Sequence, residues 1–304
     1  MNFAKLNLTR KWRSTKFDDV VGQPLAIRLI KNSLYKNLIF PVYLFSGSKG
    51  CGKTSMGRIF SAALNCSQLN NFQNNPKNHL VPCLECISCT AMQSGTHPDF
   101  IEIDAASNTG VENVRQIIDN ASFVPNLGTK KIYLIDEAHM LSKAAFNALL
   151  KILEEPPVGV IFILATTDPE KILDTVKSRC FQIFFKNIPI KDIIEHLIFL
   201  CQQENISIEE DAIKIIAQES MGSLRDAINI LERARLAYEN IDKKNVLEIL
   251  GSCDQASILK LFNSLLNNNI ANTLKIYKED LFNTFNFSIL IKNIIECLTI
   301  ALWG

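Results

Sequence analysis

The chain has 304 residues, of which 47% are hydrophobic and 21% are charged, and its formal net charge is +1. Its length and apolar content predict a globular protein of about two or three domains with a substantial hydrophobic core. The near-zero charge argues against binding of nucleic acid through a broad basic surface, so any contact with DNA would depend on a few cations and helix N-termini.

The start of the chain has no apolar segment of the kind found in secretory signals, and no uncharged apolar run reaches the roughly 18 residues that cross a bilayer. We therefore expect a cytoplasmic protein without a membrane partner, whose nine cysteines are reduced thiols. A group of these cysteines lies close together in the sequence, which indicates a metal site rather than disulfides.

Short, continuous apolar runs alternate with helical stretches between residues 42 and 185. Such runs are typical of strands that are buried on both faces of a parallel sheet. The clearest helix between them, Ser142–Glu154, has a serine at its N-cap position and stops before Pro156. This alternation predicts an α/β fold with a parallel sheet. The predicted strands are Val42–Ser46, Phe100–Asp104, Lys131–Ile135, Val160–Ala165 and Phe181–Phe185.

The pattern changes after Lys186, where the segments are helical and no strand is predicted. The expected helices cover 189–204, 208–219, 222–237, 242–250, 254–268, 270–281 and 286–302. We therefore expect an α/β domain over residues 1–185, a small helical domain over 186–242, and an all-helical, incomplete third domain over 243–304. The Asn-rich stretch Ser67–Asn78 is predicted to be a surface loop.

Residues 47–54 fit the phosphate-loop pattern G-x-x-x-x-G-K-[ST] without departure, and they lie between a predicted strand and a predicted helix. Glycines let the backbone curl so that successive N–H groups point at phosphate oxygens, and the following helix adds its positive N-terminal end. Lys53 is expected to reach the β- and γ-phosphates of ATP, and Thr54 to ligate Mg²⁺. The expected nucleotide-binding residues of the loop are Gly47, Ser48, Lys49, Gly50, Cys51, Gly52, Lys53 and Thr54.

The predicted strand Lys131–Ile135 leads into two carboxylates, Asp136 and Glu137. Ligands of parallel sheets bind beyond the carboxyl ends of the strands, so both side chains are expected to face the phosphate loop. Asp136 suits the Mg²⁺ shell, and Glu137 suits a base that orients the attacking water. Either Thr166 or Thr167, at the end of the next strand, could position this water; the alternative for each is to cap the following turn. His139 follows the acidic pair and could support it without contacting the nucleotide.

Two arginines are suited to stabilising the charge of a transition state. Arg179 is predicted at the end of a helix beside a strand, from which it could reach ATP on a neighbouring subunit. Arg225 opens a predicted helix and could reach the γ-phosphate from the same chain. For both, the competing interpretation is an ordinary solvated surface arginine.

Cys83, Cys86 and Cys89 form a C-x-x-C-x-x-C cluster, and Cys66 precedes them. Four thiolates at such short spacing can close a tetrahedral Zn²⁺ site. The residues between them are too polar for a group of free core cysteines. An iron–sulfur cluster is the alternative metal group, although nothing in the sequence indicates electron transfer.

Several segments around these motifs occur in the order found in one protein family. They are Thr9–Arg13, Phe17–Gln23, Glu102–Ser107, Asp136–Ser142, Ala145–Lys151, Leu153–Pro157, Ala165–Pro169, Ser178–Cys180 and Gly222–Ala227. From about residue 8 to about residue 240 the chain resembles the gamma/tau subunit family of bacterial DNA polymerase III, which are AAA+ ATPases of the clamp loader. The resemblance is specific because the cysteine cluster lies inside the ATPase domain, between the phosphate loop and the acidic strand.

The resemblance implies a ring of ATPase subunits that opens the sliding clamp and places it on primed DNA. Its implied partners are delta, delta-prime and further gamma/tau copies, and its implied cofactors are ATP, Mg²⁺ and Zn²⁺. Arg179 would act on the neighbouring subunit's ATP, Arg225 on that of its own chain, and Thr167 would be the sensor on the sheet. The implied site residues are Lys53, Asp136, Glu137, Thr167, Arg179 and Arg225 for catalysis, Val20 and Val21 near the adenine, Cys66, Cys83, Cys86 and Cys89 for zinc, and Thr54 and Asp136 for magnesium.

Two departures from the family pattern bear on function. The spacing before Cys83 is longer than usual because of the Asn-rich stretch. Where the family tends to carry basic residues for template phosphates, this chain has Asn108, Thr109 and Gly110, which leaves Arg115 as the nearby cation. We therefore expect weak direct contact with DNA in this segment.

Two other functions fit parts of the pattern. A subunit that only holds a ring together would typically lack the phosphate-loop lysine or the acidic pair, and both are present here. A different AAA+ remodeller, such as an initiation ATPase or a Holliday-junction motor, is disfavoured by the embedded cysteines. No polymerase active site is visible in the sequence.

Overall fold

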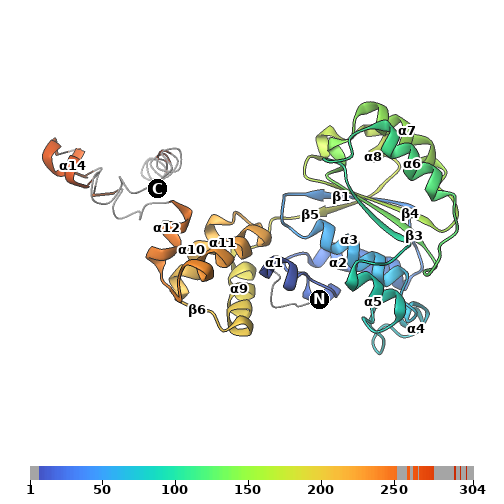
Figure 1. Cartoon of the computed structure of the whole chain (residues 1–304), viewed down its shortest axis with the longest axis horizontal. Helices are drawn as coiled ribbons and strands as arrows, with labels where there is room; N and C mark the ends of the chain where they lie inside the picture. The colour runs from blue at the N-terminus through green and yellow to red at the C-terminus, as the bar shows by residue number, and fades with distance from the viewer. Residues whose placement is uncertain are drawn as a thin grey trace. The chain divides into compact units, whose positions relative to one another are not determined.

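The computed structural model describes residues 7–251, 259–260, 263–265 and 267–276 and the single positions 291, 295 and 299. The chain divides into two compact units, whose helices and strands are labelled in Figure 1. Unit 1 runs to Ile193 and includes Gly222–Arg225, and unit 2 comprises Ile194–Met221 and the residues from Asp226 on. The expected third domain over 243–304 lies largely outside the described residues, so the three-domain division stays a prediction.

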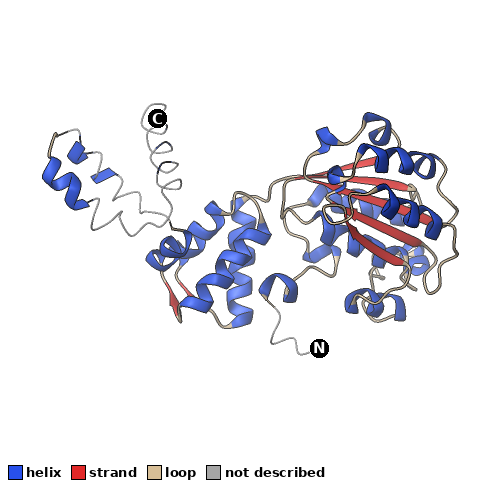
Figure 2. Cartoon of the chain, turned by 45° about the horizontal axis from the view of Figure 1, so that its top comes forward, coloured by secondary structure: helices blue, strands red, loops and turns tan. Residues whose placement is uncertain are grey.

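Unit 1 contains a five-stranded parallel sheet in the order β2-β3-β4-β1-β5. Helices lie on both of its faces (Figure 2), and each face has its own hydrophobic core. The α/β fold and the five predicted strands are therefore confirmed. The strands are β1 (Val42–Gly47), β2 (Phe100–Asp104), β3 (Lys131–Asp136), β4 (Val160–Thr166) and β5 (Phe181–Phe185).

Different helices contribute to the hydrophobic core on each face of the sheet. One core contains side chains of α2 (Pro24–Tyr35) and α3 (Lys53–Leu64), the helix that continues from the phosphate loop. The other contains side chains of α6 (Val111–Ala121) and α7 (Lys143–Glu154). The predicted cap of α7 is confirmed, because Ser142 Oγ accepts a hydrogen bond from the N–H of Ala145 at 3.1 Å. The shorter helices are α1 (Leu8–Lys11), η2 (Phe17–Asp19), α4 (Leu69–Asn74), α5 (Ile87–Ser94), η3 (Ala138–Met140), η4 (Pro169–Lys171) and α8 (Asp174–Lys177).

The prediction that every strand is buried on both faces is wrong for the two edge strands. All residues of β2 are partly or fully exposed, and β5 buries only Ile183 and Phe185. The three inner strands are almost wholly buried. An edge strand has a neighbour on one side only, and composition does not reveal which strand takes that place.

The prediction of a loop over Ser67–Asn78 is wrong in part, because Leu69–Asn74 forms helix α4. Phe72 anchors this helix in the core, and Gln73 Nε2 donates to the carbonyl of Leu34 at 3.0 Å. The Asn-rich composition hides this helix, since Phe72 and Leu69 are its only hydrophobic residues.

Unit 2 is mainly helical, with one small exception. Ser207–Ile208 (β6) and Asn240–Ile241 (β7) pair in parallel, so the prediction of no strand after Lys186 is wrong. Two-residue strands are too short to produce a periodic pattern. The predicted helices 254–268 and 286–302 fall mostly outside the described residues. The described helices after β5 are α9 (Ile190–Glu204), α10 (Glu210–Glu219), α11 (Leu224–Ala237), α12 (Lys243–Leu250) and α14 (Ile270–Ile276).

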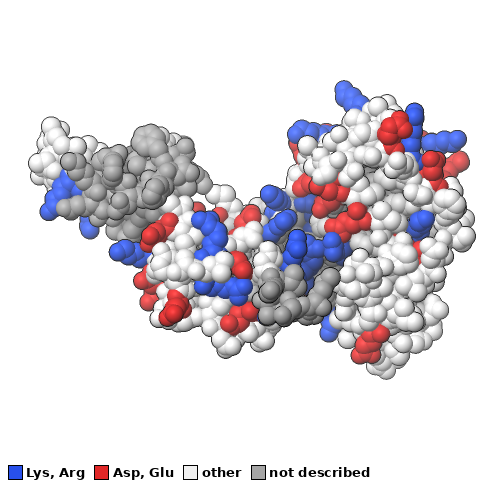
Figure 3. Space-filling view, viewed as in Figure 1, with Lys and Arg blue, Asp and Glu red and all other residues white. Residues whose placement is uncertain are grey.

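The surface agrees with the near-zero net charge. On the face shown in Figure 3, lysine and arginine side chains are interspersed with aspartate and glutamate over the described residues. Among the described helices, none is long and apolar enough to cross a membrane.

Candidate nucleotide and metal sites

The phosphate loop connects the end of β1 to the start of α3. Gly50 and Gly52 have φ angles of 74° and 101°, a region that glycine enters without a Cβ penalty. A Cβ on Gly50 would lie 2.0 Å from Ser223 Oγ and 3.2 Å from Arg225 Cβ. The loop is thus packed closely against the segment at the start of α11, and this packing brings Arg225 beside the loop.

Lys53 points back into the loop. Its ammonium donates to the carbonyls of Gly47 and Ser48 at 2.8 Å each, and the residue is 5% exposed. It also begins α3, whose first N–H groups have no partner within the helix and favour an anion. The thiol of Cys51 donates to the Ser48 carbonyl at 2.9 Å, and burial raises its pKa, so it stays neutral. The loop therefore has the donors that a polyphosphate needs.

Thr54 and Asp136, the expected magnesium ligands, are in direct contact. Thr54 Oγ1 donates to Asp136 Oδ2 at 2.8 Å, which joins the first turn of α3 to the carboxyl end of β3. The other oxygen of Asp136 accepts the N–H of Glu137 at 3.0 Å. A hydroxyl and a carboxylate held together beside a phosphate loop are the ligand types that Mg²⁺ takes in such sites, so these residues fit the ion.

Glu137 has a left-handed backbone conformation, with φ 47° and ψ 44°. This conformation is uncommon for a residue other than glycine and often occurs at functional sites. The Glu137 Oε2 atom accepts a hydrogen bond from Thr167 Oγ1 at 2.9 Å. Thr166 is fully buried and its hydroxyl lies 3.0 Å from His139 Nδ1. Of the two candidate threonines, Thr167 is therefore the one in contact with the Glu137 carboxylate.

Of the two residues expected near the adenine, Val20 lies beside the same loop. Val20 is half-buried against the core, and its Cγ1 is 3.9 Å from the position that a Cβ on Gly52 would take. Val21 follows it and is also half-buried. Val20 therefore provides an apolar side chain next to the phosphate loop, of the kind that a nucleobase site contains.

Arg179 lies in the connection between α8 and β5 and is exposed. Its guanidinium forms an ion pair with Glu154 and donates to the carbonyl of Thr175. Arg225 is also exposed, in the first turn of α11. The structure thus places Arg225 at the loop of its own chain and presents Arg179 on the surface of unit 1.

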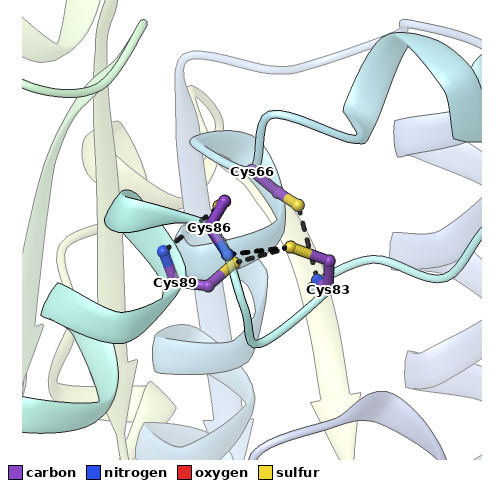
Figure 4. A group of neighbouring side chains, drawn as sticks. All are labelled: Cys66, Cys83, Cys86 and Cys89. Carbon is purple, nitrogen blue, oxygen red and sulfur yellow. Dashed lines mark hydrogen bonds between the residues drawn. The ribbon is translucent and has the colours of Figure 1, made fainter.

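The clustered cysteines converge although Cys66 is distant from the others in sequence (Figure 4). The four Sγ atoms lie within 4.8 Å of one another, and those of Cys83 and Cys89 are 3.9 Å apart. A tetrahedron with Zn–S bonds of about 2.3 Å has edges of about 3.8 Å. The spacing therefore fits one tetrahedral ion better than an iron–sulfur cluster, which lies between its sulfurs and holds them further apart.

One of these thiols already favours the thiolate form that binds metals. A hydrogen bond from the Cys89 thiol, acting against burial, lowers the pKa of Cys66 to about 5, and the N–H groups of Cys83 and Gln68 add to this effect. Cys86 Sγ accepts the N–H of Cys89 and so begins α5. The arrangement is that of a metal-binding module within unit 1.

The segment expected near DNA is a turn that leads into α6. The amide of Asn108 donates to the Asp104 carbonyl at 3.0 Å and accepts from Asn113 at 3.3 Å. Gly110 precedes α6 in extended conformation, with open space where a Cβ would lie. Arg115 pairs with Glu112 at 3.2 Å on the exposed surface. Asn108 therefore has a structural task, whereas Gly110 is open to substitution.

Comparison with known proteins decides the family. The family model "DNA polymerase III, delta subunit" matches residues 22–189, and the model "DNA polymerase III clamp loader subunit, ATPase lid domain" matches residues 192–238. DNA polymerase III subunit gamma of Buchnera aphidicola subsp. Baizongia pistaciae is 40% identical over 96% of this chain and 77% of its own length. The chain belongs to the DNA polymerase III gamma/tau family of clamp-loader ATPases.

Other members of the gamma/tau family are longer. The tau subunit of Bacillus subtilis is 42% identical over 90% of this chain, and that of Escherichia coli is 40% identical over 86%. The chain spans 47% and 40% of these two proteins. Among solved structures, Thermotoga maritima RuvB, titled a Holliday junction branch migration motor, has a TM-score of 0.55 at 17% identity, covering 85% of this chain and 80% of that one. This likeness shows the AAA+ fold alone.

One residue of the nucleotide site, Gln23, was not among the sequence-based candidates, whereas His139 was. Gln23 is buried, and its amide donates to the carbonyls of Cys51 (3.3 Å) and Lys186 (2.7 Å). These bonds connect the phosphate loop to the residue that follows β5. Its place at the end of the family segment Phe17–Gln23 was the one signal in the sequence that could have found it. His139, which the sequence offered as a supporting group for the acidic pair, contacts Thr166 and lies near Glu137.

Proposed function

We propose that this chain is the ATP-hydrolysing subunit of a clamp loader that places the sliding clamp on primed DNA. It would work with delta and delta-prime subunits and with further copies of gamma/tau. The observation that carries the proposal is the joining of three parts at one edge of the sheet: the phosphate loop, the Thr54–Asp136 pair, and Glu137 with its Thr167 contact. We also propose an ATPase domain over residues 1–185, a lid over 186–242 and a collar from 243.

Each part of the site would contribute to hydrolysis. Lys53 would exchange the loop carbonyls for the β- and γ-phosphates of ATP, at the positive end of α3. Thr54 and Asp136 would hold Mg²⁺, which neutralises charge on the phosphate oxygens. Glu137 would orient the attacking water and accept its proton. Stabilisation of the γ-phosphate would come from Arg225 of the same chain and Arg179 of a neighbour.

The chain retains the residues for ATP hydrolysis, which a purely structural ring subunit would not need. The phosphate-loop lysine is buried and oriented into the loop, and the hydroxyl and carboxylate expected to hold magnesium are already hydrogen-bonded to each other. Such an arrangement supports hydrolysis rather than ring assembly alone.

Steady-state ATP hydrolysis by the complex reconstituted with delta and delta-prime would test the proposal. Addition of the sliding clamp together with primed DNA is expected to stimulate turnover, because loading couples hydrolysis to both partners. Turnover that is absent, or that responds to neither partner, would contradict the clamp-loader assignment.

We propose Zn²⁺ as the occupant of the cysteine cluster and expect about one zinc per chain by elemental analysis. A site with four protein thiolates leaves no position for a reacting water, so the ion would stabilise the fold. Changing Cys83 and Cys86 together to serine should remove the metal and lower the melting temperature by about 5 °C or more, since 1 kcal/mol shifts it by roughly 2–4 °C in a domain of this size. Cys180→Ser is the matched control and should retain the zinc. Protein that loses the metal without any loss of stability would refute the structural role.

We propose that the turn before α6 approaches primed DNA through the helix N-terminus and with few cations. Gly110→Lys, which avoids the bonded Asn108, should then tighten binding by the ATP-bound complex. It should also steepen the slope of log K against log salt by roughly 0.9 for each new phosphate contact. A salt titration against Gly110→Gln, which adds a similar side chain without charge, is the measurement. Equal slopes for the two variants would mean that this turn does not reach the backbone.

A further inference from the structure

His139 is the middle residue of η3, two residues after Glu137, and its side chain is only 11% exposed. Its Nδ1 atom is 3.0 Å from Thr166 Oγ1 and 3.5 Å from Glu137 Oε2. A single ring nitrogen thus faces both the end of β4 and the carboxylate of the expected base. Neither the phosphate loop nor the magnesium ligands account for this side chain.

The surroundings of Nδ1 indicate which tautomer is present. Thr166 Oγ1 accepts the N–H of Asp168 at 3.1 Å and has a second lone pair for another donor, and Glu137 Oε2 carries negative charge when ionised. A bare Nδ1 lone pair would face the carboxylate oxygen and be repelled by it. The arrangement therefore favours a proton on Nδ1, which donates to Thr166 and is attracted to Glu137.

The contacts of Glu137 come from two directions. Thr167 Oγ1 donates to Oε2 at 2.9 Å, and His139 Nδ1 approaches the same oxygen at 3.5 Å. Thr166 and Thr167 are adjacent at the end of β4, so one strand end supports the carboxylate both directly and through the histidine. The backbone of Glu137 has the left-handed conformation described above, which persists only where the surrounding structure holds it.

We infer that His139 is a positioning residue for ATP hydrolysis: its Nδ1–H, held by Thr166, fixes the Glu137 carboxylate in the orientation that receives the proton of the attacking water. This inference rests on the proposed role of Glu137 as the base. His139 itself touches neither the nucleotide nor the water, and its effect passes through Glu137. A misplacement of about 1 Å at a catalytic group can lower the rate by roughly 10²-fold.

Two amide substitutions distinguish the contribution of the Nδ1 atom of His139 from that of its Nε2 atom. In His139→Asn the amide lies near the position of Nδ1 and can donate there, whereas in His139→Gln it lies nearer to that of Nε2. With the complete reconstituted complex, we expect His139→Gln and His139→Ala to lower kcat at least about tenfold, below the roughly 10²–10⁴ that a general base contributes. ATP affinity and melting temperature should stay close to those of the unmodified complex. His139→Asn should recover most of the lost turnover.

A double-mutant comparison shows whether the effect passes through Glu137. Glu137→Gln should be strongly impaired, and adding His139→Gln to it should lower kcat no further. Full turnover in Glu137→Gln would overturn the proposed role of the base, whatever His139 does. If Glu137→Gln is impaired, three results would overturn the positioning role of His139 alone. They are normal turnover in His139→Ala, equal defects in His139→Asn and His139→Gln, and additive losses of kcat in the double mutant.

Discussion

Lys53→Ala is expected to abolish ATP binding. Lys53 is buried, and its ammonium lies inside the loop in contact with two backbone carbonyls, whereas Lys49, the other lysine of the loop, is exposed. Charge-assisted hydrogen bonds contribute roughly 1.5–3 kcal/mol each. Losing those to the β- and γ-phosphates should weaken ATP binding by about 100-fold or more, as equilibrium binding of labelled ATP can measure.

The matched control for this change is Lys36→Ala, which removes an exposed lysine at the end of α2 in the same unit. It should bind ATP as the unmodified chain does. Both variants should also melt at similar temperatures, because the lysine of the loop is needed for the ligand rather than for the core. ATP affinity that survives in Lys53→Ala would show that residues 47–54 are not the nucleotide site.

Arg179→Ala should leave ATP binding nearly intact and strongly reduce turnover in the assembled ring. The reason is that its proposed target is the ATP of a neighbouring subunit, where it would stabilise charge in the transition state. Arginine residues in this role contribute roughly 10³–10⁵ in rate. The measurement is kcat of the reconstituted complex, together with ATP affinity.

The structure supplies a control that the sequence did not suggest. Arg179 forms an ion pair with Glu154, so Arg179→Ala also leaves that carboxylate without its partner. Glu154→Ala breaks the same pair but keeps the arginine, and a surface pair of this kind contributes at most about 1 kcal/mol. Turnover should therefore stay high in Glu154→Ala. A ring of Arg179→Ala subunits that hydrolyses ATP at the normal rate would rule out the trans role.

Local sequence patterns predicted the elements that depend on local causes. The inner strands are uninterrupted apolar runs because both of their faces are buried, and the Ser142 cap is recognisable since a serine oxygen there satisfies a helix N–H. The phosphate loop could be predicted because its glycines are required by backbone geometry within eight consecutive residues, 47–54. In contrast, the exposed character of β2 and β5 depends on the order of strands in the sheet, which no single segment encodes.

What the sequence by itself determined is therefore the kind of chemistry: a phosphate loop, an acidic strand end, a cysteine cluster suited to a metal, and membership of the gamma/tau family. Only the tertiary structure decided which of these groups touch. It brought Thr167 rather than Thr166 to Glu137, and it placed Arg225 at a loop more than 170 residues away. It also showed that Asn108 holds a turn and that His139 faces two oxygens at once. Residue type and spacing specify what a side chain can do, but the partner of each side chain is fixed by long-range packing, which joins segments that carry no local mark of one another.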